Sequence, residues 1–96
     1  MKKFLVLFHD EWEQKPEVMA AWQAWFAEVG DRFVDSGNPF SAGVELTRGG
    51  SHELTGEDGA ATGYSIISAE SREEAERLLA ASPFASIVRL YEASAM

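Results

Sequence analysis

Apolar and polar residues along the chain follow patterns typical of four strands. Residues 4–8 are a continuous apolar run of strand-forming residues, which predicts a strand covered on both faces. Residues 40–47 alternate between apolar and polar positions, which predicts a half-buried strand. We interpret residues 64–67 and 87–91 as the third and fourth strands.

Two segments between these strands have the spacing of helices. After Pro16, one apolar stripe about 100° wide contains Val18, Trp22, Trp25, Phe26, Val29 and Phe33. The turn at residues 36–39 ends this helix, because Gly37 suits a left-handed cap and Pro39 cannot continue a helix. Ser71 and Glu74 have the spacing of a capping box and begin the second helix.

The order of these elements predicts the fold class. A β-α-β-β-α-β order with right-handed crossovers is an α+β, ferredoxin-like βαββαβ plait: a four-stranded antiparallel sheet with two helices on one face. Residues 48–61, polar and rich in glycine, are expected to form a weakly stable loop. The other sheet face is also apolar, so we expect a homodimer formed through the sheet. With 96 residues, the chain is one domain, 1–96.

Composition and charge exclude several classes of function. Eight Lys and Arg oppose sixteen Asp and Glu, which makes an acidic protein of net charge −8. Nucleic acids and anionic membranes attract clustered basic residues, so we expect neither as a partner. The chain has no cysteine, which excludes disulfides and thiol chemistry. Its first apolar run is too short for a signal peptide or a membrane span, and we expect a cytoplasmic protein.

His9 is the best candidate for a catalytic group. It follows the first strand directly and has acidic neighbours, so it could act as a general acid or base near neutral pH. Trp12 could line the mouth of a pocket there, and His52 could lie in a lid over a ligand. Neighbouring side chains on an extended strand point in opposite directions, so His9 and Asp10 converge poorly as metal ligands. We expect no metal and no cofactor.

Charged residues within strands are the other candidates. Arg89 shares a strand face with Tyr91, and Glu45 interrupts the second predicted strand. Because an unpaired buried charge is costly, Arg89 needs a partner if its face is the dimer interface. We favour an interface salt bridge with Glu45 of the other subunit. Alternatively, Arg89 binds a ligand anion, with Tyr64 and Tyr91 as hydrogen-bonding walls.

Several stretches, in order, resemble the YCII-related family of small dimeric α+β barrel proteins. They are residues 3–8, 21–25, 30–31, 34–39 and 63–71, which with the last strand cover nearly the whole chain. The resemblance implies a ferredoxin-like plait that dimerises through its sheets. It implies little about chemistry, because most members have no known function, although the superfamily includes dehalogenases and cofactor-free monooxygenases.

The residues depart from the family at its proposed catalytic positions. Members proposed to be enzymes have a histidine near the start of the first helix, where this chain reads Glu17-Val18-Met19-Ala20-Ala21. We therefore favour a YCII-like small-molecule-binding or accessory protein without catalysis. The alternative is a small cofactor-independent lyase or isomerase that acts on a small organic acid, with His9 as its acid/base.

Overall fold

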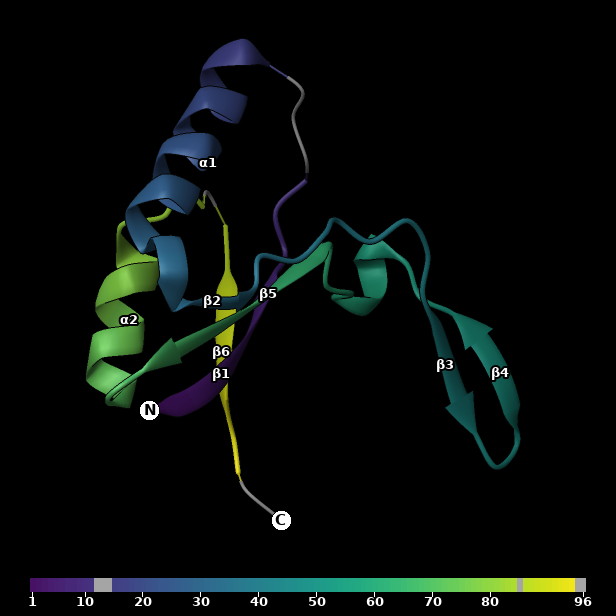
Figure 1. The fold of residues 1–96 in the computed structure, drawn as a ribbon. Coiled ribbons are helices and arrows are strands. Elements are labelled where there is room, and N and C mark those ends of the chain that lie inside the picture. The colour runs from purple at the N-terminus through teal and green to yellow at the C-terminus, as the bar shows by residue number, and fades with distance from the viewer. Residues whose placement is uncertain (12–14, 85, 95–96) are drawn as a thin grey trace.

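The computed structural model describes residues 1–11, 15–84 and 86–94. Trp12, the residue expected at a pocket mouth, lies outside these residues. Along the chain the elements are β1 (Lys2–Phe8), α1 (Pro16–Val29), β2 (Phe33–Asp35), β3 (Val44–Thr47), β4 (Gly50–Glu53), β5 (Gly63–Ala69), α2 (Arg72–Ala80) and β6 (Val88–Ala93), with short 3-10 turns after α1 and β4 (Figure 1).

Four strands form one antiparallel sheet in the order β2-β5-β1-β6. The first strand of the chain is therefore central, with β5 on one side and β6 on the other. Leu5 lies opposite Ile66 of β5 and Tyr91 of β6, which fixes the register on both sides. The fold is thus α+β with a four-stranded antiparallel sheet and two helices, which agrees with the predicted class. The edge strand next to β5 is β2 rather than the predicted strand over residues 40–47, and β3 and β4 form a separate two-stranded sheet.

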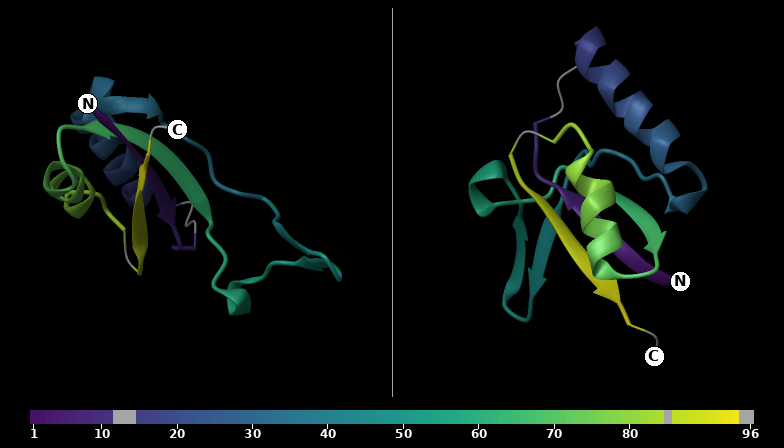
Figure 2. Two further views of the ribbon diagram at one scale, coloured as in Figure 1. Left: turned by 90° about the horizontal axis from the view of Figure 1, so that it is seen from below. Right: turned by 90° about the vertical axis from the view of Figure 1, so that its left-hand side faces the viewer.

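Both helices pack against the same face of this sheet (Figure 2). Phe4, Val6 and Phe8 alternate along β1 as fully buried side chains. They meet α1 and α2 in a core whose buried apolar members are Phe4, Val6, Phe8, Trp22, Trp25, Val29, Ile67, Ala69, Ala75 and Leu79. The rings of Phe8, Trp22 and Trp25 meet edge to face, an arrangement that aromatic quadrupoles favour. As predicted, Trp22 and Trp25 of the α1 stripe are core residues, whereas Phe26 of the same stripe is 38% exposed.

The first helix ends earlier than its apolar stripe suggests. It stops at Val29, and Gly30 takes a positive φ of 57°, a conformation that glycine adopts without steric cost. Phe33, the last member of the predicted stripe, lies instead in β2 and pairs with Ile67 of β5. The prediction that Gly37 caps the helix is therefore wrong; Gly37 lies in the turn after β2.

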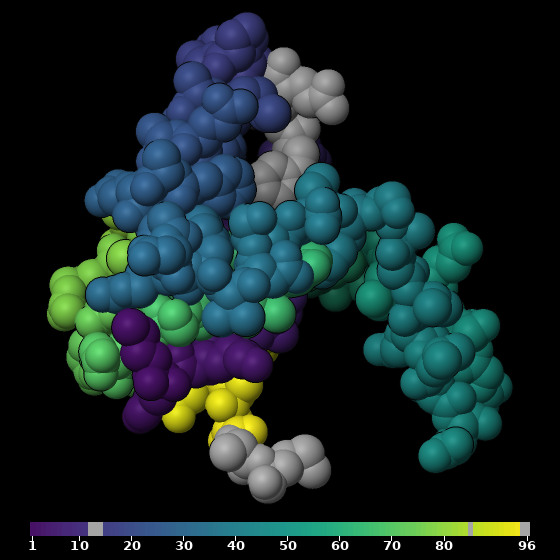
Figure 3. Space-filling view, viewed as in Figure 1, coloured from purple at the N-terminus to yellow at the C-terminus, as the bar shows by residue number. Residues whose placement is uncertain are grey.

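Residues 43–54 form a projecting hairpin, which we call the arm. The prediction of a half-buried strand over residues 40–47 is wrong, because β3 covers only Val44–Thr47 and is exposed throughout. The predicted loop contains β4, which pairs with β3 in a separate two-stranded sheet. In the space-filling view the arm stands apart from the body of the molecule (Figure 3).

The second helix begins as predicted. The hydroxyl of Ser71 accepts a hydrogen bond from the backbone N–H of Glu74 at 3.2 Å, which satisfies one free donor of the first turn. Within the part of the chain that the structure describes, neither helix is long and apolar enough to cross a membrane.

Candidate functional site

The sheet face turned away from the helices carries most of the predicted site residues. Cross-strand partners share a face, so the open face contains Leu5 and Leu7 of β1, Tyr64 and Ile66 of β5, and Arg89 and Tyr91 of β6. Leu5, Leu7 and Ile66 are only partly exposed, whereas 54% of Tyr91 is exposed. Among the described residues, the helices cover β1 on one face, so its continuous apolar run leaves an apolar strip on the other.

His9 and Arg89 meet at one end of the open face. The backbone N–H of His9 donates to the carbonyl of Ile87 at 3.2 Å, so His9 lies beside the start of β6, as antiparallel pairing predicts. Despite this offset, Nη1 of Arg89 reaches to 3.4 Å from Nε2 of His9. A guanidinium and an imidazole side by side, with Leu7 next to them on the sheet, can receive a carboxylate.

The carboxylate of Asp10 is hydrogen-bonded to Ser86, just before the last strand begins. Asp10 is buried, and its carboxylate accepts hydrogen bonds from the backbone N–H and the hydroxyl of Ser86, at 2.8 and 2.6 Å. Asp10 therefore holds the segment just before β6 in place. This contact helps to position β6, and with it Arg89, next to the end of β1 where His9 lies. This role is structural, and it is a reason for Asp at position 10 that the sequence pattern does not suggest.

Tyr64 is engaged within its own chain at the other side of the open face. Its hydroxyl donates to a carboxylate oxygen of Asp35 at 2.8 Å, which raises the pKa of Tyr64. The same hydrogen bond, with a second from the N–H of Gly37, lowers the pKa of Asp35. The ring of Phe40 stacks on Tyr64 with 5.6 Å between centroids. Tyr64 therefore lies apart from the pair formed by His9 and Arg89.

The arm holds the two remaining predicted residues. Glu45 and His52 are cross-strand partners on the arm. His52 lies 3.4 Å from Asp58, whose pKa is lowered chiefly by the backbone N–H of Thr55 and further by His52. The predicted ligand-binding residues that the structure describes are thus divided between the open face and the arm, and His9 and Arg89 come within 3.4 Å of each other.

A pocket that the sequence pattern did not locate lies between α1 and the loop of residues 36–39, and we call it the helix–loop pocket. Of the predicted ligand-binding residues, its lining includes Tyr64. It has a volume of about 470 Å³. Its lining residues are Phe8, Met19, Trp22, Phe26, Ser36, Gly37, Asn38, Pro39, Tyr64 and Ser65. Phe8, Trp22 and Ser65 are buried and form its floor, while Met19 and Phe26 of α1 are exposed.

Gly37 closes the loop wall of this pocket. It has a φ of 86°, and a Cβ at this position would lie only 1.6 Å from the backbone oxygen of Tyr64. Ser65 holds the same loop, because its hydroxyl donates to the carbonyl of Ser36 at 2.7 Å. The Ser-Gly-Asn-Pro turn is thus the sequence signal that could have located this wall: its glycine lets the loop approach β5 closely.

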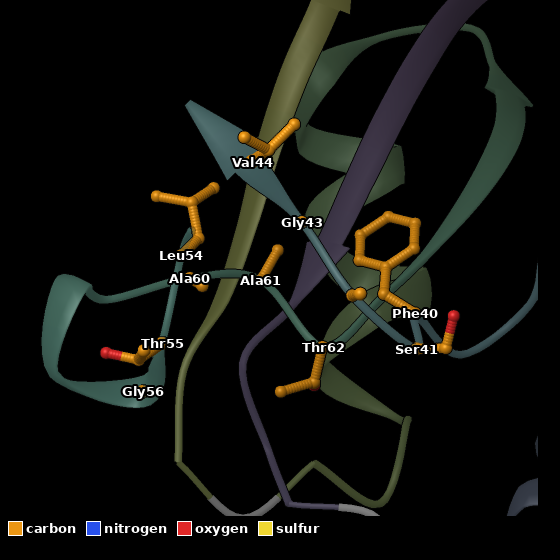
Figure 4. Close-up of a pocket in the computed structure, with 11 residues that line it drawn as sticks. Phe40, Ser41, Gly43, Val44, Leu54, Thr55, Gly56, Ala60, Ala61 and Thr62 are labelled. Atoms are coloured by element: carbon orange, nitrogen blue, oxygen red, sulfur yellow. The ribbon is translucent and has the colours of Figure 1, made fainter. Parts of the chain in front are cut away.

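A second hollow lies at the root of the arm (Figure 4). It has a volume of about 450 Å³ and is lined by Phe40, Val44, Leu54 and several small residues. All of its lining residues are exposed or only partly buried, so it lacks the buried floor of the helix–loop pocket. It is a groove on an exposed segment rather than an enclosed cavity.

Among the described residues, no three His, Asp or Glu side chains are grouped closely enough to hold a metal ion. No family model, curated protein or solved structure matches the chain. The helix–loop pocket and the His9 end of the open face are therefore the two candidate sites of this protein.

Proposed function

We propose that this protein binds a small molecule in the helix–loop pocket and does not catalyse a reaction. The supporting observation is the pocket itself. Its volume of about 470 Å³ is within the usual range for small-molecule sites. Its lining is mainly aromatic and aliphatic, and Ser36, Asn38, Tyr64 and Ser65 are its polar residues.

The lining favours an uncharged ligand. No charged side chain is among the described residues that line the pocket. A carboxylate that entered the pocket would lose its hydration without gaining a cation. Burying an unpaired neutral polar group costs about 2–7 kcal/mol, and burying an unpaired carboxylate costs more. The chain charge of −8 adds a long-range repulsion. We therefore expect a neutral, largely apolar ligand with one or two hydrogen-bonding groups.

The experiment compares neutral aromatic or aliphatic amides and alcohols with carboxylates of the same shape. Binding is followed by NMR at the indole N–H of Trp22, which lines the pocket. The indole N–H of Trp25 is an internal control, because it donates to the carbonyl of Leu78 at 2.8 Å in the core. We expect neutral compounds to shift the Trp22 signal and their carboxylates to leave it unchanged.

A matched pair of variants tests the location. Met19→Trp should fill the mouth of the pocket and abolish binding, whereas Ala20→Trp, on an exposed position next to it that does not line the pocket, should bind normally. Equal binding by both variants, or binding of carboxylates in preference to neutral compounds, would contradict the proposal.

A second candidate function is supported by the contact between His9 and Arg89. The 3.4 Å distance between Nη1 and Nε2 brings a cation next to an imidazole, an arrangement that suits a lyase or isomerase acting on a small organic acid. Arg89 would bind the carboxylate and His9 would transfer the proton. A chemical-shift titration of His9 with a panel of organic acids tests this role, with His52 as the control. If no acid changes the chemical shifts of His9, the proposed catalytic role of His9 is refuted.

The fold and assembly implied by the YCII-related resemblance are part of the same proposal. The strand order β2-β5-β1-β6 is the order expected of a ferredoxin-like plait when the arm is set aside. The apolar strip of Leu5, Leu7 and Ile66 on the open face supports a homodimer formed through the sheet. Light scattering at micromolar concentration should give about twice the chain mass of 10.6 kDa. A monodisperse monomer would refute the dimer.

A further inference from the structure

The arm has two apolar side chains that are largely exposed in the part of the chain that the structure describes. Leu46 is 76% exposed and Val44 is 54% exposed. Within the described residues, β3 and β4 pair only with each other. A two-stranded hairpin of this kind is marginally stable in water without a surface to pack against. The extended shape of the arm in Figures 1 and 3 therefore points to a surface outside its own chain.

The register of the hairpin gives the arm two chemically different faces. Directly opposed residues point to the same side of a two-stranded sheet. Val44 lies opposite Glu53 and Leu46 opposite Ser51, so one face combines two apolar side chains with the carboxylate of Glu53. The other face carries Glu45 and His52. Any surface that covers Val44 and Leu46 must therefore also receive Glu53 and not Glu45.

The His9 end of the open face has the complementary chemistry. Ile87 is 50% exposed beside it, and Leu7 lies opposite Arg89. Among the residues that the structure describes, Arg89 contacts the ring of His9 and no carboxylate. A partner that covers this surface must bring apolar groups and one acid, because a guanidinium buried without a counter-ion is costly.

We propose that the arm of each copy docks on the His9 end of the open face of a second copy, where Glu53 pairs with Arg89. The inference rests on the homodimer proposed above and identifies the segment that completes its interface. It revises the sequence-based expectation that Glu45 makes this ion pair. A two-fold axis lets each copy give one arm and receive one, so both apolar arms are covered at once.

Two charge reversals test the pair by complementation. Glu53→Arg opposes Arg89 in its own homodimer, and Arg89→Glu opposes Glu53 in the other. Each variant alone should dimerise at least about tenfold more weakly than the parent, by sedimentation or light scattering over a concentration series. In an equimolar mixture, one interface of the mixed dimer joins the two substituted positions, which again carry opposite charges, and the other interface retains Glu53 against Arg89. Dimers should therefore return to within a few fold of the parent.

Glu45→Arg is the matched control, because it reverses a charge on the same strand pair but on the opposite face. Glu45→Arg should dimerise like the parent. Mixing it with Arg89→Glu should not restore dimerisation of the Arg89→Glu chain. Circular dichroism of each variant verifies folding, and Arg89→Gln replaces Arg89→Glu if the reversal unfolds the chain; it should weaken dimerisation without complementing Glu53→Arg.

The outcomes separate this inference from the proposal on which it rests. A parent that stays monomeric refutes both the dimer and the docked arm. A stable dimer that Glu53→Arg leaves unchanged refutes the docked arm alone and leaves a dimer formed by the sheets. Loss in both single variants without recovery in their mixture also refutes the pairing of Glu53 with Arg89. None of these results bears on ligand binding in the helix–loop pocket.

Discussion

Trp25 links the two helices and the sheet, and its removal should be the most damaging single change in α1. Its side chain is 2% exposed and packs edge to face against Phe8, Trp22 and Phe33. Its indole N–H also donates to the carbonyl of Leu78 at 2.8 Å. That carbonyl is in the last turn of α2, where helical carbonyls have no partner within the helix.

The cost of Trp25→Ala has two parts. Truncating a buried tryptophan costs about 3–5 kcal/mol through lost burial and the cavity that remains. An unpaired carbonyl at Leu78 adds about 1–3 kcal/mol unless water reaches it. Domains of this size are stable by roughly 5–14 kcal/mol, so the variant should lose a third or more of its stability. The corresponding fall in Tm is about 20 °C or more.

Urea unfolding measured by circular dichroism gives the free energies, and two variants divide the loss. Trp25→Phe keeps an aromatic ring but loses the donor, so it should cost about 1–3 kcal/mol. Phe26→Ala removes a neighbouring ring that is 38% exposed, and it should cost only about 1–2 kcal/mol. If Trp25→Ala unfolded within about 1 kcal/mol of the parent, the packing of α1 described above would be wrong.

Three further changes test the turn after β2, the cap of α2 and the pair formed by Tyr64 and Asp35. Gly37→Ala should destabilise by more than about 1 kcal/mol in urea unfolding, because φ is positive and the added Cβ would meet the backbone oxygen of Tyr64; a neutral effect would contradict this close approach. Ser71→Ala should cost about 1 kcal/mol through loss of the N-cap, measured in the same way, and an unchanged midpoint would mean that the cap is not formed in solution. In a Tyr91→Phe background, the ultraviolet titration of Tyr64 should lie above that of free tyrosine, because its hydrogen bond to Asp35 raises its pKa, and Asp35→Asn should bring it down. A raised folded-state pKa means that this contribution to stability is present below pH ~10 and is lost as the pH rises through the pKa of Tyr64; no change on Asp35→Asn would exclude the pair.

Local sequence patterns predicted correctly those features that depend on residues close together in the chain or on simple strand pairing. The capping residues of α2 identified its start, since a hydroxyl and a backbone N–H three residues away interact within one turn. Antiparallel pairing of the first and last strands predicted that His9 lies beside the start of β6, and the hydrogen bond to Ile87 agrees. The length of the Arg89 side chain, rather than its position on the strand, decides that it still reaches His9.

The helix stripe shows where a local pattern stops being sufficient. Phe33 is four residues after Val29, so it continues the apolar period of α1 although it belongs to β2. The apolar spacing shows which side chains are apolar, but it does not show whether a helix or a strand places them in the core. Phe33 packs against the core from strand β2, which pairs with β5, and its ring is partly buried there. Only the tertiary structure decides whether this residue belongs to the helix or to the strand.

By itself, then, the sequence determined that α1, α2 and β1 form and where their apolar residues lie, though not where α1 ends, because these features depend mainly on contacts within a few residues. The tertiary structure alone decided the rest. Alternation at Val44 and Leu46 indicates a strand but not whether a core lies beneath it, and here the strand projects as an arm. The helix–loop pocket likewise needs Trp22 and Asn38 brought together from separate elements. Such juxtapositions depend on how surfaces distant along the chain pack, which no local period encodes.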